Sequence, residues 1–500
     1  METALEELEV RVDRPAPEGQ GIARSVPGAA PAAEGAGGSA AGPRSAPTAR
    51  PEGSTTAGRV IFVPYAAPGD RLRVRLRKVE KGFAEAELLE VLSPGPERVE
   101  PVCAHHFRPG GPLPCGGCNW QQLSAKGQLE AKRDIVVDCL RRIGRIPEPP
   151  VEPALPSPKV LRYRNKVLIP FGAREGRVVA GFFSPGTNAI VDFTDCPVQP
   201  ELSVRIALRV KALCAELGWR PYDVRAHEGW LRHLLVRTNE DGKALIALVT
   251  NDSTFPRKDE FLKRILVGFP EIVAILHNVQ PHRTSVALGS AWRTLWGESE
   301  LEERLGTLRL RAAPAAFMQV NTPASLVLYE AARALLCADG FRPELLFDLY
   351  SGVGSIALCL SGAAERIVGI EENRDAVENA RRNARFNEVK NCEFVPGRVE
   401  TALGRLHASF EKKPPLSCAA LLDPPRAGCE ESVLKSLNSP AMRRIVYISC
   451  NPATFARDAA RLARGGWRLR RVQPVDLFPQ TSHIETVGVF ERDAPASPTI

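Results

Sequence analysis

The sequence has no apolar stretch long enough to cross a membrane, and its first residues (METALEELEV) lack the basic segment and apolar run of a signal peptide. We therefore expect a cytoplasmic protein that has no membrane partner. Cysteine is also sparse, with 12 in 500 residues, which excludes a scaffold held together by disulfides. In a reducing compartment, clustered cysteines indicate metal binding or catalysis.

The composition is that of a folded protein with several domains. At 500 residues the chain is long enough for two to four domains, and 44% of its residues are hydrophobic, which supplies a large core. Its 66 Lys and Arg residues exceed its 58 Asp and Glu residues, and the formal charge of +8 favours a polyanionic partner. Residues 26–57 are rich in Ala, Gly, Pro and Ser and predict a disordered insert.

The N-terminal region predicts a small barrel. Short strand-like runs alternate with turns over residues 8–91 on both sides of the insert, which indicates an OB-like fold. In RLRVRLR, basic and apolar residues alternate, so the basic ones share one strand face. This face is either solvated or contacts the RNA backbone, because guanidinium groups suit phosphate geometry. Its residues are Arg71, Arg73, Arg75 and Arg77.

Four cysteines form a candidate metal site. Cys103, Cys115 and Cys118 lie in CAHHFRPGGPLPCGGC, which is a loop because it holds two Gly-Gly pairs and three prolines. Cys196 lies far along the chain in the turn-rich DFTDCPVQP. Three clustered thiols and one distant thiol are a common pattern of iron–sulfur ligands, but four thiolates can also hold zinc. Unrelated free thiols are the third interpretation, which the glycine-flanked CxxC disfavours.

The middle of the chain predicts a mostly β region with some helix. Gln121–Arg142 is expected to be an amphipathic helix, and residues 160–310 contain several strand-like runs. A basic cluster, RYRNK, opens this second stretch and is either a charged edge or an RNA contact. Its basic residues are Arg162, Arg164 and Lys166.

The C-terminal part alternates strands with helices, which is typical of a parallel α/β domain. The strand-like ELLFDLY leads into a GxGxxA loop that precedes a helix and contains Gly352, Gly354 and Ser355. Glu371 ends the following strand, where an acid can bind both ribose hydroxyls of a nucleotide cofactor. This motif fits NAD and S-adenosylmethionine equally well.

Two later strand ends point to the chemistry. Asp423 begins DPPR, whose prolines form a rigid floor beside a cofactor's reactive end and are not needed by a dehydrogenase. Arg426 stands where amino-group methyltransferases have an aromatic residue, which disfavours methylation of an exocyclic amine. In IVYISCNPAT, Cys450 lies between a strand and a helix N-terminus, which is expected to lower the pKa of the thiol. The alternative is a small core cysteine.

The chain resembles the bacterial RNA (uracil-5-)-methyltransferases in five motifs that follow the family's order: FDLYSGVG, IEENRDAVENARRNA, DPPRAG, SCNPATFARD and FPQTSHIE. It also resembles the family's N-terminal TRAM domain, an OB-type RNA-binding module, in GQGIAR and FVPYAAPGDRLRVRL. The resemblance implies an α/β protein. Its expected parts are an interrupted TRAM barrel at 1–93, a central α+β domain at 94–316 and a Rossmann-like class I methyltransferase domain at 317–500.

The resemblance also implies roles for single residues. Cys450 is expected to add to C6 of a uridine, and Glu485 to remove the C5 proton, with His483 as an alternative base. The implied contacts of S-adenosylmethionine are Gln319, Tyr350, Gly352, Gly354, Ser355, Glu371 and Asp423. The implied ligands of a [4Fe–4S] cluster are Cys103, Cys115, Cys118 and Cys196.

We therefore expect a monomeric enzyme that methylates C5 of a specific uridine in RNA. The four cysteines favour 23S ribosomal RNA, and transfer RNA is the alternative substrate. Two further functions compete with methylation: that of a non-catalytic RNA-binding protein and that of an NAD-dependent enzyme, which leaves SCNPAT and DPPR unexplained.

The chain departs from the family in the long gap between Cys103 and Cys115, in Ser355 instead of Asn, and in Arg398 where an acid often faces the adenine.

Overall fold

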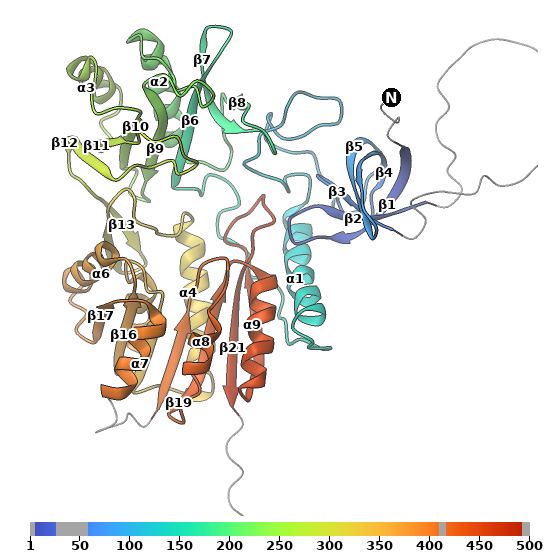
Figure 1. Cartoon of the computed structure of the whole chain (residues 1–500), viewed down its shortest axis with the longest axis vertical. Coiled ribbons are helices and arrows are strands. Elements are labelled where there is room, and N and C mark those ends of the chain that lie inside the picture. Colours follow the sequence, from blue (N-terminus) through green and yellow to red (C-terminus); the bar gives the residue numbers. More distant parts are fainter. Residues whose placement is uncertain (1–5, 27–58, 410–416, 493–500) are drawn as a thin grey trace, which may run out of the picture.

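The protein consists of three folded parts, which the computed structural model describes over residues 6–26, 59–409 and 417–492. A small barrel forms one end, and a mostly β central part lies beside the C-terminal sheet (Figure 1). One long helix, α1 (Ala125–Arg142), stands between the barrel and the C-terminal part. The predicted insert at 26–57 falls, apart from its first residue, outside the described residues. In the part of the chain described, no helix is long and apolar enough to span a membrane.

The N-terminal part is a closed barrel, as predicted, with the strand order β1-β2-β3-β5-β4. The apolar residues Leu72, Val74 and Leu76 of β4 are buried in its core, because alternate side chains of a strand point to opposite faces. The strands are β1 (Glu7–Pro15), β2 (Gly21–Ser25), β3 (Val60–Val63), β4 (Arg71–Val79) and β5 (Phe83–Ser93).

The central part is built on a seven-stranded sheet with the order β12-β11-β10-β9-β6-β7-β8. β10 and β11 are parallel, and the other neighbours are antiparallel. Helices α2 (Glu201–Glu216) and α3 (Lys258–Gly268) share one apolar core with the sheet, which confirms the α+β prediction. The strands are β6 (Lys166–Arg174), β7 (Arg177–Phe183), β8 (Ile190–Asp192), β9 (Leu231–Thr238), β10 (Ala244–Thr250), β11 (Ile272–Val279) and β12 (Ala291–Gly297).

The C-terminal part is a doubly wound sheet with the order β17-β16-β15-β18-β19-β21-β20. β15 to β19 are parallel, whereas β21 is antiparallel to both of its neighbours. This arrangement confirms the predicted Rossmann-like fold. The strands are β15 (Leu345–Leu349), β16 (Arg366–Glu371), β17 (Cys392–Pro396), β18 (Cys418–Leu422), β19 (Met442–Ser449), β20 (Trp467–Val475) and β21 (Glu485–Arg492).

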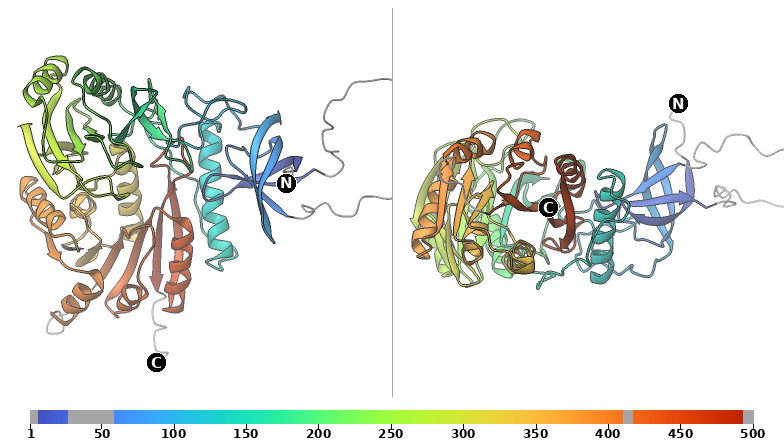
Figure 2. Two further views of the ribbon diagram at one scale, coloured as in Figure 1. Left: turned by 45° about the horizontal axis from the view of Figure 1, so that its top comes forward. Right: turned by 90° about the horizontal axis from the view of Figure 1, so that it is seen from below.

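Helices cover both faces of this sheet (Figures 1 and 2). One core joins the sheet to α4, α5 and α6 and to a β-hairpin, and a second core joins it to α7, α8, α9 and α1. The hairpin strands are β13 (Leu301–Leu305) and β14 (Leu308–Ala312). The helices are α4 (Thr322–Leu336), α5 (Ser355–Cys359), α6 (Arg374–Phe386), α7 (Val399–Ser409), α8 (Glu431–Ser436) and α9 (Pro452–Arg464), with single 3-10 turns at Ala338–Gly340 and Ser361–Ala363.

The packing of α1 differs from the predicted division of the chain. Ile135 and Val136 of α1 share a core with Phe455 of α9, so this helix belongs to the helical layer of the C-terminal sheet. Val151 and Leu155, which follow α1, form parallel bridges to edge strand β20. Part of the predicted central domain therefore packs on the C-terminal part, and it brings the residues around α1 close to the β20–β21 connection.

Candidate active site

Cys450 and Glu485, the two predicted catalytic residues, lie close together where the parallel strands of the C-terminal sheet end. This carboxyl end of the parallel strands is called the active-site edge below. β19 and β21 pair antiparallel, and the last pair in their ladder joins Ser449 with Thr486. Cys450 directly follows Ser449, and Glu485 directly precedes Thr486, so both residues lie just beyond this last pair at the same end of the two strands. Their charges interact accordingly, since ionised Glu485 raises the pKa of the Cys450 thiol.

Asp423 and Arg426 lie at the same edge, because they follow β18, which is parallel to its neighbours β15 and β19. The charge of Asp423 raises the pKa of both Cys450 and Glu485, whereas the charge of Arg426 lowers both. Arg426 also contacts His483, with 3.5 Å between Nη2 and Nδ1. One cation therefore faces the thiol, the carboxyl group and the imidazole of this cluster.

The Cys450 thiol is harder to ionise than its position in the sequence suggested. Burial, followed by the charges of Glu485 and Asp423, raises its pKa to about 11. The expected lowering by the helix N-terminus is wrong for this structure. The N-cap of α9 is Asn451, whose side chain accepts from the Ala453 N–H at 3.0 Å, and the thiol lies before that cap. Removal from water therefore outweighs the effect of the helix.

The acidic residues of the cluster are also shifted toward their neutral forms. Glu485 is 3% exposed, and burial together with the charge of Asp423 raises its pKa well above the usual range. Burial raises the pKa of Asp423 to about 7. Burial therefore favours the neutral form of Glu485, and this carboxyl group must be ionised before it can act as a general base.

The glycine loop after β15 has the geometry of a nucleotide-binding turn. Tyr350 (φ 67°), Gly352 (φ 53°) and Gly354 (φ 82°) all adopt left-handed backbone angles. The Gly352 N–H donates to one carboxylate oxygen of Glu371 at 3.0 Å, and the Asn373 N–H donates to the other at 2.8 Å. Each oxygen keeps a second lone pair, so Glu371 can still accept hydrogen bonds from ribose hydroxyls.

Two polar residues outside the predicted set are buried here, Asp348 in β15 and Ser351 within the loop. Their side-chain oxygens have no close hydrogen-bond partner among the described residues, although the Ala357 N–H lies near enough to Asp348 to lower its pKa. Burial and the charge of Asp423 raise the pKa of Asp348 to about 8. Buried oxygens without partners suit a cationic, hydroxyl-rich cofactor such as S-adenosylmethionine. The acid inside the apolar strand ELLFDLY was the signal for this role.

The remaining predicted cofactor residues border the same edge. Ser355 is the first residue of α5, and Gln319 lies in the segment that leads into α4. Residues of the central part hold this segment, since the Asn165 N–H donates to the Val320 carbonyl at 2.8 Å. Lys166 Nζ also donates to the carbonyl of Ala316, at 3.2 Å. The central part therefore holds the segment that carries Gln319.

The four predicted metal ligands approach one another. Burial and the charges of Cys196, Cys115 and Cys103 together raise the pKa of Cys118 to about 12. A bound cation would favour the ionised forms of these four thiols. Among the described residues, however, no group of His, Cys, Asp or Glu side chains has the arrangement of a metal site. The metal centre stays a prediction.

The arginine row of the barrel carries little net charge. Each of its four members forms an ion pair with a glutamate of a neighbouring strand. The pairs are Arg71 with Glu9 (3.2 Å), Arg73 with Glu90 (3.2 Å), Arg75 with Glu7 (2.7 Å) and Arg77 with Glu87. Phosphate groups would have to compete with these carboxylates, and RNA contact at this row stays a prediction.

The three residues of the second basic cluster have different surroundings. Arg162 forms two hydrogen bonds with Asp195 (2.9 and 3.0 Å) and one with the Cys196 carbonyl (2.8 Å), so it stabilises the cysteine turn. Burial and a neighbouring arginine lower the pKa of Lys166 to about 8. The charge of Arg164 lowers the pKa of His483, which places Arg164 near the active site. Of this cluster, Arg164 is therefore the best placed for an RNA contact.

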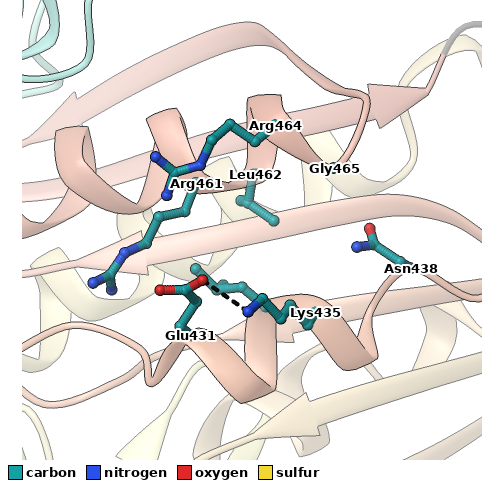
Figure 3. Close-up of a pocket in the computed structure, with 8 residues that line it drawn as sticks. Glu431, Lys435, Asn438, Arg461, Leu462, Arg464 and Gly465 are labelled. Carbon is teal, nitrogen blue, oxygen red and sulfur yellow. Dashed lines mark ion pairs between the residues drawn. The ribbon is translucent and has the colours of Figure 1, made fainter.

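Two pockets lie away from the active-site edge. One, with a volume of about 160 Å³, lies between α8 and α9 and is lined by Lys435, Arg461 and Arg464, among others (Figure 3). Both arginines belong to the last turn of α9, whereas Cys450 precedes its first turn. The other, of about 520 Å³, lies between α4 and β20. The residues that line these two pockets include none of the predicted site residues.

The parallel sheet, the glycine loop with Glu371 and the strand end at Asp423 define a class I methyltransferase. Comparison with known proteins assigns the chain more closely. Residues 300–493 match the tRNA (uracil-5-)-methyltransferase family model, and residues 48–89 match the TRAM domain. The chain belongs to the RNA (uracil-5-)-methyltransferase family and is an S-adenosylmethionine-dependent enzyme, as the sequence motifs predicted.

Relatives match along most of the chain. An uncharacterized RNA methyltransferase of Halalkalibacterium halodurans is 37% identical over 435 residues, which cover 87% of this chain and 92% of the relative. One of Clostridium tetani is 37% identical over 428 residues, with 85% and 90% covered. The crystal structure of Pyrococcus abyssi tRNA (uracil-54, C5)-methyltransferase in complex with S-adenosyl-L-homocysteine is 26% identical, with a TM-score of 0.70 over 96% of this chain and 99% of that one.

Proposed function

We propose that this enzyme methylates C5 of a uridine in RNA through a covalent bond between Cys450 and C6 of the base. The observation that supports the proposal is the register of β19 and β21, whose last pair, Ser449 with Thr486, is flanked by Cys450 and Glu485 at the end of the sheet near Asp423. A nucleophile and a base are needed on one side of a flat ring, and residues at the same end of two paired strands suit this arrangement.

The chemistry follows from the weakness of uracil C5 as a nucleophile. When the Cys450 thiolate adds to C6, C5 becomes an enolate-like carbon that can take a methyl group. S-adenosylmethionine supplies that group as an electrophilic methyl sulfonium. Glu485 then removes the C5 proton, and elimination breaks the bond to C6 and frees Cys450. The target base must leave its stack to reach the site.

Both residues must be ionised before they can act, and Arg426 assists them. The thiol and the carboxyl group have raised pKa values in the free enzyme, and Arg426 is the cation that lowers both. Its guanidinium cannot lose its own charge at any relevant pH. Arg426 therefore favours the thiolate and the carboxylate, in addition to any contact that it makes with the base.

The proposed cofactor contacts surround the glycine loop. Glu371 would hold the ribose, the acids Asp348 and Asp423 would face the cationic groups, and the side chain of Gln319 would close the site from the α4 side. The backbone of the loop itself would border the cofactor. The loop residues are Tyr350, Gly352, Gly354 and Ser355.

We propose 23S ribosomal RNA as the substrate, with transfer RNA as the alternative. The four adjacent cysteines support the ribosomal substrate, because they fit the cluster-bearing branch that the sequence motifs resemble. The transfer-RNA enzyme of Pyrococcus abyssi, which is similar along its whole length, supports the alternative. Mapping 5-methyluridine in RNA from a strain that lacks the gene and from the complemented strain tests both. Loss of one 23S site would support the first, and loss of a transfer-RNA site the second; an unchanged pattern in all RNA would contradict the function.

We also propose that the four cysteines hold a [4Fe–4S] cluster, with zinc as the alternative. The electrostatic interaction of Cys118 with Cys103, Cys115 and Cys196 supports a common ligand for the four thiols, which would be deprotonated when a metal binds. Protein purified without oxygen should be brown and absorb near ~400 nm if iron–sulfur chemistry is present. A colourless protein with one zinc per chain would contradict the cluster.

A further inference from the structure

The connection between β20 and β21, residues 476–484, leads directly into Glu485 and is held mainly by a distant part of the chain. The Trp120 N–H donates to the Gln480 carbonyl at 3.1 Å, and the Gln480 N–H donates to the side chain of Gln128 at 2.8 Å. Lys132, buried in α1, pairs with Asp476 at 2.5 Å. All three partners lie within 14 residues after the last cysteine of the cysteine loop, Cys118.

Of the partners that follow the cysteine loop, Asn119 contacts this connection nearest to Glu485. Its Oδ1 accepts from the Ser482 N–H at 3.0 Å, and its Nδ2 is 3.1 Å from the Ser482 hydroxyl. The same Nδ2 donates to the Glu18 carbonyl of the barrel at 3.2 Å. Asn119 directly follows Cys118, so one side chain links the cysteine loop, the barrel and the chain just before Glu485.

The connection does not hold its shape by local geometry alone. Gln480 has a left-handed backbone (φ 71°), which is unfavourable for a residue other than glycine and persists only when its surroundings fix it. The Tyr163 hydroxyl also donates to the Pro479 carbonyl at 2.8 Å. External partners therefore stabilise the conformation of residues 476–484 together with local hydrogen bonds, such as that from the Thr481 hydroxyl to the Phe478 carbonyl at 2.8 Å.

We propose that Asn119 is a positioning residue that couples the cysteine loop to the catalytic base. It fixes Ser482, and through Ser482 it fixes where the chain enters β21 and where the Glu485 carboxyl lies. This inference rests on the proposed role of Glu485. It adds that the order of the loop around Cys118 controls one step of the reaction, removal of the C5 proton.

The two chemical steps respond differently to such a loss. Methyl transfer needs Cys450 and the cofactor but not the Glu485 carboxyl, whereas proton removal depends on the distance between that carboxyl and C5. A misplacement of about 1 Å can slow a step by about 100-fold. Loss of the Asn119 side chain should therefore leave methyl transfer nearly intact and delay release of the enzyme from the RNA. A purely structural defect would lower both steps together.

The test compares Asn119→Ala with Asn239→Ala in the full-length enzyme. Asn239 is a matched control, because it is also half-buried and its side chain also accepts one backbone N–H (from Lys243, 2.8 Å) and donates to one carbonyl (of Glu302 in β13, 2.8 Å). The substrate is total RNA labelled with [5-³H]uridine in cells that lack the gene, and the donor is S-adenosylmethionine with a ¹⁴C-methyl group. The measured quantities are transferred ¹⁴C, released ³H and the fraction of protein bound to RNA in denaturant.

The wild type and Asn239→Ala should release one ³H for each ¹⁴C transferred. In a single turnover, with enzyme in excess over RNA sites, Asn119→Ala should transfer ¹⁴C within about 3-fold of the wild-type rate and release ³H about 10- to 100-fold more slowly, with accumulation of the RNA adduct. Equal rates of both steps in Asn119→Ala would overturn the coupling. Glu485→Gln separates this result from failure of the proposed function: if it also releases ³H as fast as it transfers ¹⁴C, the base assignment and the coupling both fail.

Discussion

The side-chain amide of Asn451 donates a hydrogen bond to the backbone carbonyl of Arg426, at 3.2 Å. The Thr454 hydroxyl donates to the same carbonyl at 3.3 Å. Two motifs that are far apart in the sequence, DPPR and SCNPAT, are therefore joined at the edge of the sheet. This contact fixes the segment that carries Arg426 beside Cys450, where its charge lowers the pKa of the thiol.

Replacing Cys450 with alanine should abolish the covalent complex with RNA that contains 5-fluorouridine. Fluorine at C5 cannot leave as a proton does, so an enzyme that uses C6 addition is trapped after methyl transfer. A gel run in denaturant detects the trapped species. Cys337→Ala is the control, since this thiol is partly exposed at the end of α4 and is no predicted site residue. A complex that forms without the Cys450 thiol would exclude it as the nucleophile.

Glu485→Gln should accumulate an RNA–protein adduct on ordinary substrate RNA. The amide keeps the size of the side chain but cannot take the C5 proton, so the reaction stops after methyl transfer. We expect turnover to fall at least ~100-fold while the adduct becomes visible by mass spectrometry. Glu303→Gln is the matched control, because Glu303 is also a buried acid (1% exposed) but lies in the β13 strand. Normal turnover of the Glu485 variant would remove this residue from its role.

The sequence motifs predicted each part of the site but not how the parts meet. Cys450 and Glu485 are 35 residues apart, and their contact depends on β21 lying antiparallel beside β19. The sequence of a strand such as TVGVFE does not indicate which strand it will pair with or in which register. The contact between the glycine loop and Glu371 was easier to predict from the sequence, because the motif, the strand and the helix are consecutive in the chain.

The pKa of Cys450 and the packing of α1 show a second limit of prediction from the sequence, because both depend on residues that are distant in the chain. A helix N-terminus is visible in the sequence, but the burial that outweighs it depends on the distant residues packed around the thiol. Likewise, the amphipathic pattern predicted α1 within Gln121–Arg142 correctly. Its partner, α9, comes more than 300 residues later, so the attachment of α1 to the C-terminal sheet could not be predicted from local sequence.

Replacing Arg426 with glutamine should slow alkylation of Cys450. The reactive form is the thiolate, and a thiol with a pKa of about 11 is roughly 0.1% ionised at pH 8. Removal of the cation raises this pKa further, so labelling by iodoacetamide at pH 8 should fall and its rise with pH should move to higher pH. Peptide mass spectrometry measures the labelled fraction. Arg443→Gln, an exposed change at the other end of β19, should leave the rate unchanged. Faster labelling of the Arg426 variant would contradict this arrangement.

The affinity for S-adenosylmethionine should rise with pH, and more steeply than the affinity for S-adenosylhomocysteine. Asp423 has a pKa of about 7 in the free protein, so it is largely neutral at pH 6 and largely ionised at pH 8. A positively charged sulfonium binds the ionised form better, whereas the demethylated product has a neutral sulfur. The ratio of the two dissociation constants should therefore favour the charged ligand increasingly as the pH passes through 7. Calorimetric titrations at pH 6, 7 and 8 give both constants. Asp423→Asn should reduce the change of this ratio between pH 6 and 7, while the ionisation of Asp348, whose pKa is about 8, still contributes at higher pH. Asp339→Asn, an exposed control, should retain the full dependence. A pH-independent ratio in the wild type would show that Asp423 does not face the sulfonium.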